Sequence, residues 1–143
     1  MSLQWLIDTC VVSELFRPAP ERSVLAWLDR HGHACAMAAV SFGEISYGIE
    51  CLPLGARRNA LTAWAQGLQE RYADRTLPTD TGVWNAYGRL RASLRAIGRP
   101  QDSPDLLIAA TASVHGLTLV TRNTRHFEDT GVPLLNPWTA STT

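Results

Sequence analysis

The sequence predicts an α/β domain in which helices cover both faces of a parallel sheet. Short apolar runs alternate with segments whose apolar residues recur at helical spacing, which is typical of such a sheet. The chain has 143 residues, close to the usual size of one domain and long enough to bury its own core. Its composition, 45% hydrophobic and 18% charged, is that of a globular protein and excludes a disordered chain.

Strands are expected where a short apolar run is bounded by polar residues or turn formers. The four segments that meet this description are Leu3–Ile7, Ala34–Val40, Leu117–Thr121 and Leu134–Leu135. The alanines of the second segment also suit a helix. Residues 75–78 are too few to assign, so we expect a central parallel sheet of four or five short strands.

Helices are expected where apolar residues recur every three or four positions between capping and breaking residues. The first is a short helical stretch stopped by Pro18 and Pro20. The last begins at Ser103, a predicted N-cap followed by Pro104 at the first helical position, and it ends at Gly116. The expected helices are residues 9–16, 21–30, 42–52, 56–72, 81–97 and 104–115.

Charge and composition exclude several functions. The 13 basic and 13 acidic residues balance, so bulk charge does not indicate a nucleic-acid-binding protein. Every basic residue is an arginine, and the lack of lysine excludes Walker-A ATPases and Schiff-base enzymes. The N-terminus lacks the pattern of a secretory signal and no apolar run is long enough to span a membrane, so we expect a cytoplasmic protein without a membrane partner. The three cysteines, predicted to be buried free thiols, are Cys10, Cys35 and Cys51.

Three acidic residues occupy positions that a parallel sheet brings together. Asp8 ends the first expected strand, Glu44 begins the helix after the second, and Asp105 lies in the first turn of the helix that leads to the third. Thr121 and Asn123 follow that third strand. Because ligands of such folds gather at the carboxyl ends of the strands, we expect these side chains to converge there.

Convergent carboxylates require a cation. Two carboxylates ~5 Å apart at an effective dielectric of ~20 repel by roughly 3 kcal/mol. The donors are all oxygen atoms, so the expected cation is Mg²⁺ or Mn²⁺. A carboxylate-bound ion of this kind activates water and stabilises an oxyanion, which predicts metal-assisted hydrolysis of a phosphodiester.

Two of the three acids also have a structural interpretation. Ser41 and Glu44 match a capping box at the start of a helix. Asp105 would be favoured in a first turn by the helix dipole alone. Asp8 is harder to explain structurally, because a carboxylate at the end of an apolar strand needs a partner.

The order and spacing of these motifs resemble the PIN-domain ribonucleases, specifically the VapC-type toxins of bacterial type II toxin–antitoxin systems. The matching segments span nearly the whole chain. They are Leu6-Ile-Asp8-Thr9 with Ser13-Glu14-Leu15, Ser41-x-x-Glu44-Ile45-x-x-Gly48-Ile49, Asp105-Leu-Leu-Ile-Ala-Ala-Thr-Ala112, Leu119-Val-Thr121-Arg-Asn123 with Phe127, and Asn136-Pro137-Trp138.

The resemblance implies a single PIN domain over residues 1–143, a three-layer sandwich with an Mg²⁺- or Mn²⁺-dependent endoribonuclease activity. Asp8, Glu44 and Asp105 match the family's three metal-binding acids, and Thr9, Thr121 and Asn123 match its other catalytic polar positions. Some relatives carry an aspartate where Asn123 and His126 stand here. We therefore expect one firm metal site, with a second metal recruited by RNA.

The resemblance also implies a homodimer and a cognate VapB-like antitoxin that places basic or aromatic side chains in the acidic cleft. The exposed parts of the two long central helices are candidate surfaces for these partners. Helical spacing places Trp64, Trp84 and Tyr87 mainly in the core. The sequence does not specify the RNA target.

Binding of an RNA substrate requires positive charge near the acidic cleft. Arg91 and Arg95 lie four residues apart on one helix face, and Arg122 and Arg125 flank Asn123. We interpret these arginines as phosphate contacts. A solvated helix face is the alternative for Arg91 and Arg95.

Two other functions compete with the ribonuclease. One is a PIN module that binds RNA or a protein without cleavage, although the complete set of three acids argues against it. The other is a phosphatase of the haloacid-dehalogenase type with Asp8 as nucleophile. That chemistry requires a second aspartate where Cys10 stands and a lysine, which the chain lacks.

Overall fold

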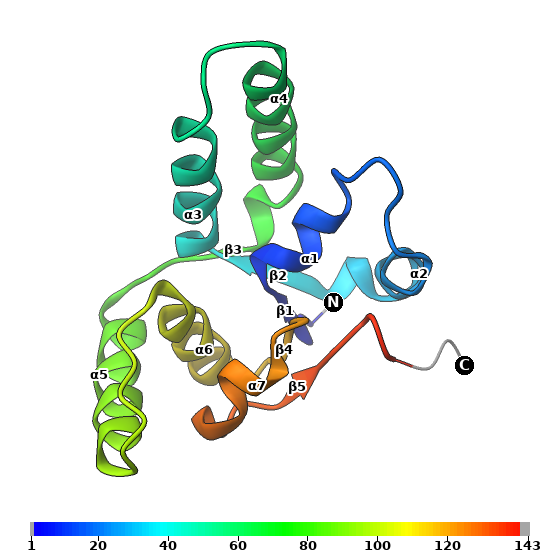
Figure 1. Ribbon diagram of the computed structural model, residues 1–143. Helices are drawn as coiled ribbons and strands as arrows, with labels where there is room; N and C mark the ends of the chain where they lie inside the picture. The colour runs from blue at the N-terminus through cyan, green and yellow to red at the C-terminus, as the bar shows by residue number, and fades with distance from the viewer. Residues whose placement is uncertain (1, 141–143) are drawn as a thin grey trace.

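The computed structural model describes residues 2–140, in which five strands form one sheet with parallel neighbours throughout (Figure 1). The strand order is β3-β2-β1-β4-β5, so the chain enters at the middle of the sheet and then builds both sides. The predicted parallel sheet is confirmed. The strands are β1 (Trp5–Ile7), β2 (Cys35–Ala38), β3 (Thr76–Leu77), β4 (Thr118–Val120) and β5 (Leu134–Leu135).

Helices occupy the connections between the strands, and each helix expected from the sequence is present. The α-helices are α1 (Thr9–Glu14), α2 (Arg22–His31), α3 (Ala39–Glu50), α4 (Ala56–Arg71), α5 (Thr81–Ala96), α6 (Pro104–His115) and α7 (Thr124–Phe127). Short 3-10 turns are η1 (Gly32–Ala34), η2 (Ala73–Arg75) and η3 (Glu128–Thr130). The strand β3 and the helix α7 extend the predicted set.

Alternate strand residues point to opposite faces of the sheet, and each face packs against its own helices. Ile7 and Val120 join a buried cluster with side chains of α1, α2, α3 and α4. Leu6 and Leu119 join a second buried cluster with α6 and with Phe127 of α7. Helices therefore cover both faces, which confirms the predicted three layers.

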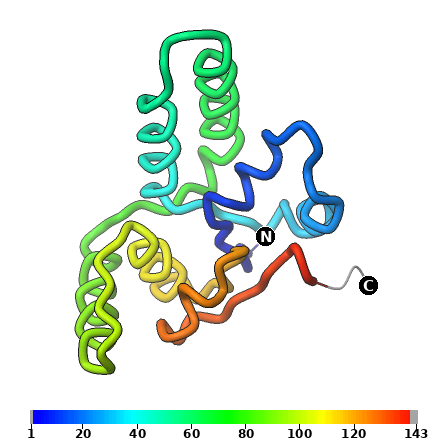
Figure 2. Tube along the Cα trace, in the orientation of Figure 1, coloured from blue at the N-terminus to red at the C-terminus, as the bar shows by residue number. Residues whose placement is uncertain are grey.

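Two helix pairs project from the sheet in different directions (Figures 1 and 2). The helix α3 packs with α4, and α5 packs with α6. In the second pair, Val83 and Ala86 are buried against Ala110 of α6. Trp84 lies on the other side of α5 and is 51% exposed, so its expected place in the core is wrong. The small residues at 86 and 110 let the two helices approach closely, and the bulky Trp84 is directed outward.

The expected domain bounds, residues 1–143, extend past the described residues at both ends. Among residues 2–140, no helix combines the length and apolar character needed to cross a bilayer.

Candidate active site

Three carboxylates lie at the carboxyl edge of the sheet. Asp8 follows the central strand β1, Glu44 lies on α3 after the neighbouring strand β2, and Asp105 lies in the first turn of α6. Burial raises the pKa values of Glu44 and Asp105, and neighbouring charges add to both shifts: those of Asp105 and Asp8 at Glu44, and that of Asp8 at Asp105. The structure thus brings together the three acids that the sequence analysis singles out.

Asp8 is held by several donors. It is the N-cap of α1, where its Oδ1 accepts a hydrogen bond from the backbone amide of Thr9 at 2.8 Å. Its Oδ2 accepts from the Thr121 hydroxyl, also at 2.8 Å, and from the Cys10 thiol at 3.6 Å. The side chain is only 4% exposed. These hydrogen bonds are the partners that a carboxylate at the end of an apolar strand needs.

Thr121 connects Asp8 to the segment after β4. Its fully buried hydroxyl donates to Asp8 and accepts a hydrogen bond from the backbone amide of Asn123 at 3.1 Å. Asn123 is exposed and stands at the N-cap position of α7, where its side chain makes no capping hydrogen bond. Thr121 therefore positions Asp8, and the side-chain amide of Asn123 is left available to a ligand.

Glu44 meets Thr9 across the gap between α3 and α1. The Thr9 hydroxyl donates to Oε1 of Glu44 at 3.2 Å. Burial is the largest cause of the raised pKa of Glu44, the Asp105 charge is the next, and the hydrogen bond from Thr9 opposes both. Thr9 thus touches Asp8 through its backbone and Glu44 through its side chain.

The expected capping box at Ser41 and Glu44 is wrong. The helix α3 begins at Ala39, and its N-cap residue, Ala38, makes no side-chain capping bond. Glu44 therefore lies in the second turn, and the buried hydroxyl of Ser41 has no hydrogen-bond partner among the described residues. The chain turns from β2 directly into α3 because alanine suits both elements at this junction. Without a capping role, Glu44 is available for other chemistry.

Asp105 has a histidine as its partner. Nε2 of His126 lies 3.0 Å from Oδ2 of Asp105, and His126 belongs to α7. Burial is the largest cause of the raised pKa of Asp105, followed by the Asp8 charge, and His126 opposes the shift. Ser103 stands at the N-cap position of α6, yet its hydroxyl makes no capping bond. The predicted Ser103 cap is therefore correct in position and wrong in its side-chain contact.

The chemistry of this edge fits a hard divalent cation. Within residues 2–140, no three His, Cys, Asp or Glu side chains already surround one point as metal ligands. The acids nevertheless lie close enough for the Asp8 charge to contribute to the raised pKa values of both Glu44 and Asp105, and a divalent cation would relieve that repulsion. The available oxygen donors are those that Mg²⁺ and Mn²⁺ prefer. The residues that could hold such an ion are Asp8, Glu44 and Asp105.

The arginines expected to bind RNA fall into two groups. Arg122 and Arg125 line an open cavity of about 740 Å³ together with Asp105, Asn123 and His126. The guanidinium of Arg122 also lies 5.1 Å from the ring centroid of Trp138, which restrains that side chain. The second group, Arg91 and Arg95, lies on α5 and borders a different cavity.

Another hollow begins at Glu44 and continues between α1, α3 and α4. Its first part, about 300 Å³, is lined by Thr9 and Glu44 at one end and by Leu61 and Trp64 at the other. A neighbouring cavity of about 400 Å³ shares Leu61 and Trp64 and extends to Phe16. We call the two together the α3–α4 groove. It joins the Glu44 carboxylate to apolar side chains, and Arg57 lines both of its cavities.

Comparison with protein families accounts for this arrangement. The chain matches the PIN domain over residues 5–133, a range that contains Asp8, Glu44 and Asp105. The protein belongs to the PIN domain family. The resemblance that the sequence motifs indicate is thereby confirmed.

Relatives of this PIN domain cover nearly its whole length. It is 35% identical over 135 residues to VapC ribonuclease Y4jK of Sinorhizobium fredii, which covers 93% of this chain and 96% of the relative. It is 30% identical over 138 residues to the tRNA(fMet)-specific endonuclease VapC of Shigella flexneri, at 95% and 98% coverage. Its fold resembles a chain of FitAB bound to an IR36 DNA fragment, with a TM-score of 0.88, 34% identity, and coverage of 96% and 98%.

Cys10 also lies in the site, although the sequence predicts it only as a buried free thiol. Its Sγ lies 3.6 Å from Oδ2 of Asp8 and 3.7 Å from the hydroxyl of Thr121. Burial and the Asp8 charge raise the thiol pKa to about 11, so the thiol stays protonated at neutral pH. Cys35 is buried as predicted, whereas the predicted burial of Cys51 is wrong, since it is exposed just after α3. No sequence signal distinguishes these three thiols.

Proposed function

We propose that this PIN domain is a metal-dependent endoribonuclease toxin that acts on RNA in the cytoplasm and is neutralised by a cognate antitoxin. The observation that carries the proposal is the set of three carboxylates, delivered by three separate segments, at the carboxyl edge of the sheet, where burial and the neighbouring acids raise the pKa values of Glu44 and Asp105. Arranging like charges in this way costs free energy unless a cation joins them. The relatives named as ribonucleases support the same interpretation.

Each residue of the site has a distinct part in this proposal. Asp8, Glu44 and Asp105 would hold Mg²⁺ or Mn²⁺, which supplies Lewis-acid stabilisation of charge on the phosphodiester oxygens. Thr121 and Thr9 orient Asp8 and Glu44 through their hydrogen bonds.

The polar groups around Asp105 would receive the RNA. Asn123 presents an amide whose side chain makes no capping bond, and it shares a cavity with Asp105. Arg122 and Arg125 line the same cavity and supply the positive charge for a phosphate next to the carboxylates. With an amide in place of a fourth acid, this side contributes no further negative charge, so we propose one firm metal site.

The α3–α4 groove is the proposed binding site of the antitoxin. A solved structure named FitAB, which contains a chain at 34% identity, supports a small protein partner for this fold. An antitoxin segment with apolar residues would cover Leu61 and Trp64, and a basic side chain would reach Glu44. We also propose that two copies of this protein form a homodimer.

The decisive experiment is cleavage of total tRNA and ribosomal RNA by antitoxin-free protein. Reactions contain Mn²⁺, Mg²⁺ or EDTA, and the variants are Asp8→Asn and, as a matched control, Asp29→Asn, an exposed carboxylate on α2. We expect discrete fragments with metal, none with EDTA or with Asp8→Asn, and normal cleavage by Asp29→Asn. The name of the Shigella relative makes the tRNA fraction the first to examine.

Two results would contradict the proposal. If wild-type protein binds Mn²⁺ normally and cleaves no RNA of the pool, the non-cleaving PIN module that binds RNA or protein becomes the better explanation. If wild-type protein does not bind Mn²⁺ in a calorimetric titration, the three carboxylates do not form a metal site.

A further inference from the structure

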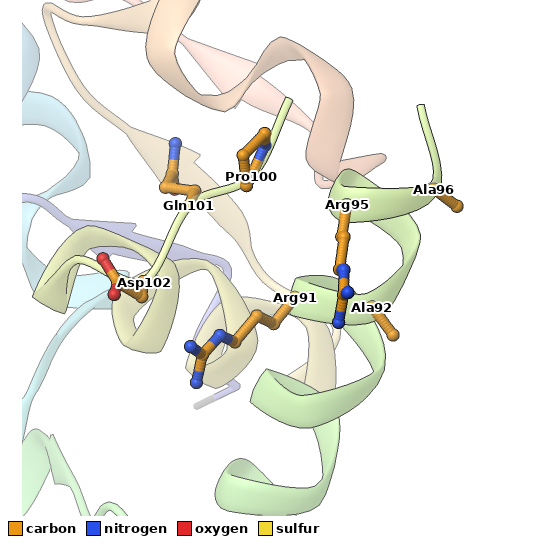
Figure 3. A pocket seen from close by; sticks show the side chains of 7 residues that line it. All are labelled: Arg91, Ala92, Arg95, Ala96, Pro100, Gln101 and Asp102. Carbon is orange, nitrogen blue, oxygen red and sulfur yellow. The ribbon is translucent and has the colours of Figure 1, made fainter. Parts of the chain in front are cut away.

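A cavity of about 780 Å³ lies between the C-terminal half of α5 and the segment that leads into α6 (Figure 3). We call it the α5 pocket. One wall carries two arginines, which are one helical turn apart on α5, and the other wall carries an amide and a carboxylate. Its lining residues are Arg91, Ala92, Arg95, Ala96, Pro100, Gln101 and Asp102.

The helical wall of the α5 pocket has positive charge that the protein itself does not neutralise. Within residues 2–140, neither Arg91 nor Arg95 has a carboxylate at salt-bridge distance. The nearby Arg99, in contrast, lies 2.8 Å from a carboxylate oxygen of Asp129, an ion pair that ties the segment after α5 to η3. Arg91 extends from α5 toward the wall that carries Asp102 (Figure 3). The two guanidinium groups can therefore bind an anion.

The opposite wall of the α5 pocket carries Gln101 and Asp102. The Oε1 atom of Gln101 is buried and has no hydrogen-bond partner among the described residues. Its Nε2 donates to the backbone carbonyl of His126 at 3.5 Å. Asp102 adds a carboxylate, and its backbone carbonyl accepts from the Tyr87 hydroxyl at 3.4 Å. The Gln101 oxygen is closed off from the cavity, so the Asp102 carboxylate is the side-chain acceptor that this wall offers to a ligand with N–H groups.

We propose that the α5 pocket is a nucleotide subsite of the ribonuclease, in which Arg91 and Arg95 bind a backbone phosphate and the Asp102 carboxylate accepts a hydrogen bond from the exocyclic amine of a base. The proposal rests on the proposed function. The carboxylate of Asp102 repels phosphate and so directs it to the helical wall. Cytosine, adenine and guanine carry an exocyclic amine, and uracil does not, so uracil is the poorest occupant.

The α5 pocket is connected to the acidic site through Gln101. The side-chain amide of Gln101 donates a hydrogen bond to the backbone carbonyl of His126, and the ring of His126 contacts Asp105. Asp102 lies just before α6, and Asp105 lies in the first turn of that helix. A strand of RNA that reaches Asp105 and the arginines beside it would therefore continue into the α5 pocket, which places the subsite next to the cleaved bond.

The phosphate half of the proposal is tested by binding without cleavage. The probe is a fluorescein-labelled single-stranded RNA of random sequence in EDTA, measured by anisotropy over a range of NaCl concentrations. We expect the double variant Arg91→Ala/Arg95→Ala to bind about tenfold more weakly, and the slope of log K against log[salt] to fall by about 0.7 for each phosphate that the variant no longer neutralises. The control, Arg71→Ala/Arg89→Ala, removes two exposed arginines outside the pocket and should leave both quantities near wild type.

Equal affinity and slope for the two double variants would overturn the subsite. A change in the molar mass of the protein in light scattering, with RNA binding equal to the control, would also overturn it and assign the pocket to a protein contact.

The base half is tested by sequencing both ends of the fragments that wild-type protein cuts from random-sequence RNA with Mn²⁺. We expect depletion of uracil at one position beside the cut. Asp102→Asn supplies an N–H donor and should raise the use of uracil there by about tenfold. Asp74→Asn, an exposed carboxylate in η2, is the control.

Identical base profiles for wild-type protein, Asp102→Asn and Asp74→Asn would overturn the base contact. If wild-type protein cuts nothing, the proposed function fails, whereas the binding experiment in EDTA still decides the phosphate contact.

Discussion

The two sides of the acidic site are built differently. Asp8 is nearly inaccessible to solvent, and two hydrogen bonds of 2.8 Å hold its carboxylate. Glu44 and Asp105 are more accessible, and each meets one side-chain partner, Thr9 at 3.2 Å and His126 at 3.0 Å. Their pKa values are raised. Asp8 thus contributes to the stability of the fold, whereas the charged forms of Glu44 and Asp105 are disfavoured by their surroundings and cost stability.

Asp8→Ala should destabilise the protein more than any other single change at this site. The variant removes the cap of α1 and leaves the buried Thr121 hydroxyl without its acceptor. Loss of a cap costs about 1 kcal/mol, and an unsatisfied buried donor costs about 1–3 kcal/mol. Relief of repulsion at Glu44 and Asp105 offsets part of this. We expect the free energy of unfolding in EDTA to fall by roughly 2 kcal/mol in a urea titration.

Asp8→Asn serves as the control for Asp8→Ala. Its amide oxygen keeps one acceptor, so the variant should recover part of the lost stability while its metal affinity stays low. A stability for Asp8→Ala equal to that of wild type would show that the hydrogen bonds of Asp8 do not stabilise the fold.

The next effect concerns Thr121, the side chain that orients Asp8. In Thr121→Val, Oδ2 of Asp8 loses its strongest side-chain donor, and the backbone amide of Asn123 loses its acceptor. We expect a loss of about 1–2 kcal/mol in the free energy of unfolding and a weakening of Mn²⁺ binding by roughly tenfold or more, measured by calorimetry.

Thr111→Val is the matched variant for Thr121→Val. The Thr111 hydroxyl is equally buried and donates to the backbone carbonyl of Leu107 at 2.7 Å within α6. Its removal should lower stability by a similar or smaller amount without changing Mn²⁺ affinity. Equal Mn²⁺ affinities for the two variants would remove Thr121 from the site and leave it a structural residue only.

Most of the architecture can be predicted from the sequence because the core strands and helices have strong local signals. The run Leu3–Ile7 ends in Asp8, and Pro104 marks the start of α6, so the positions of two acids follow from local rules. The start of α3 could not be predicted, because Ala38 and Ala39 suit both a strand and a helix and only tertiary packing decides between them.

The contacts around the acids could not be predicted from local signals. Cys10 bonds Asp8 at the sheet edge, and His126 reaches Asp105 from a four-residue helix with no capping pattern. The exposure of Trp84 also depends on how closely α5 approaches α6, which the helical period alone does not specify. The pairing of His126 with Asp105 and the packing of α5 on α6 join residues far apart in the chain, and no local pattern in one sequence pairs them.

The smallest effect tests the other side of the site. Because the pKa of Glu44 is raised on folding, its charge opposes the folded state, and the stability that protonation gives is lost as the pH rises. Glu44→Gln should therefore be more stable than wild type in EDTA at pH 7, by about a few tenths of a kcal/mol after solvent screening. Thermal unfolding should show the gain shrinking as the pH falls from the raised pKa of the folded state toward the ordinary pKa of 4.5, and no gain below that value. Glu70→Gln, on the exposed side of α4, should show no such gain, and equal behaviour of the two variants would mean that Glu44 carries no strain to be relieved by a metal.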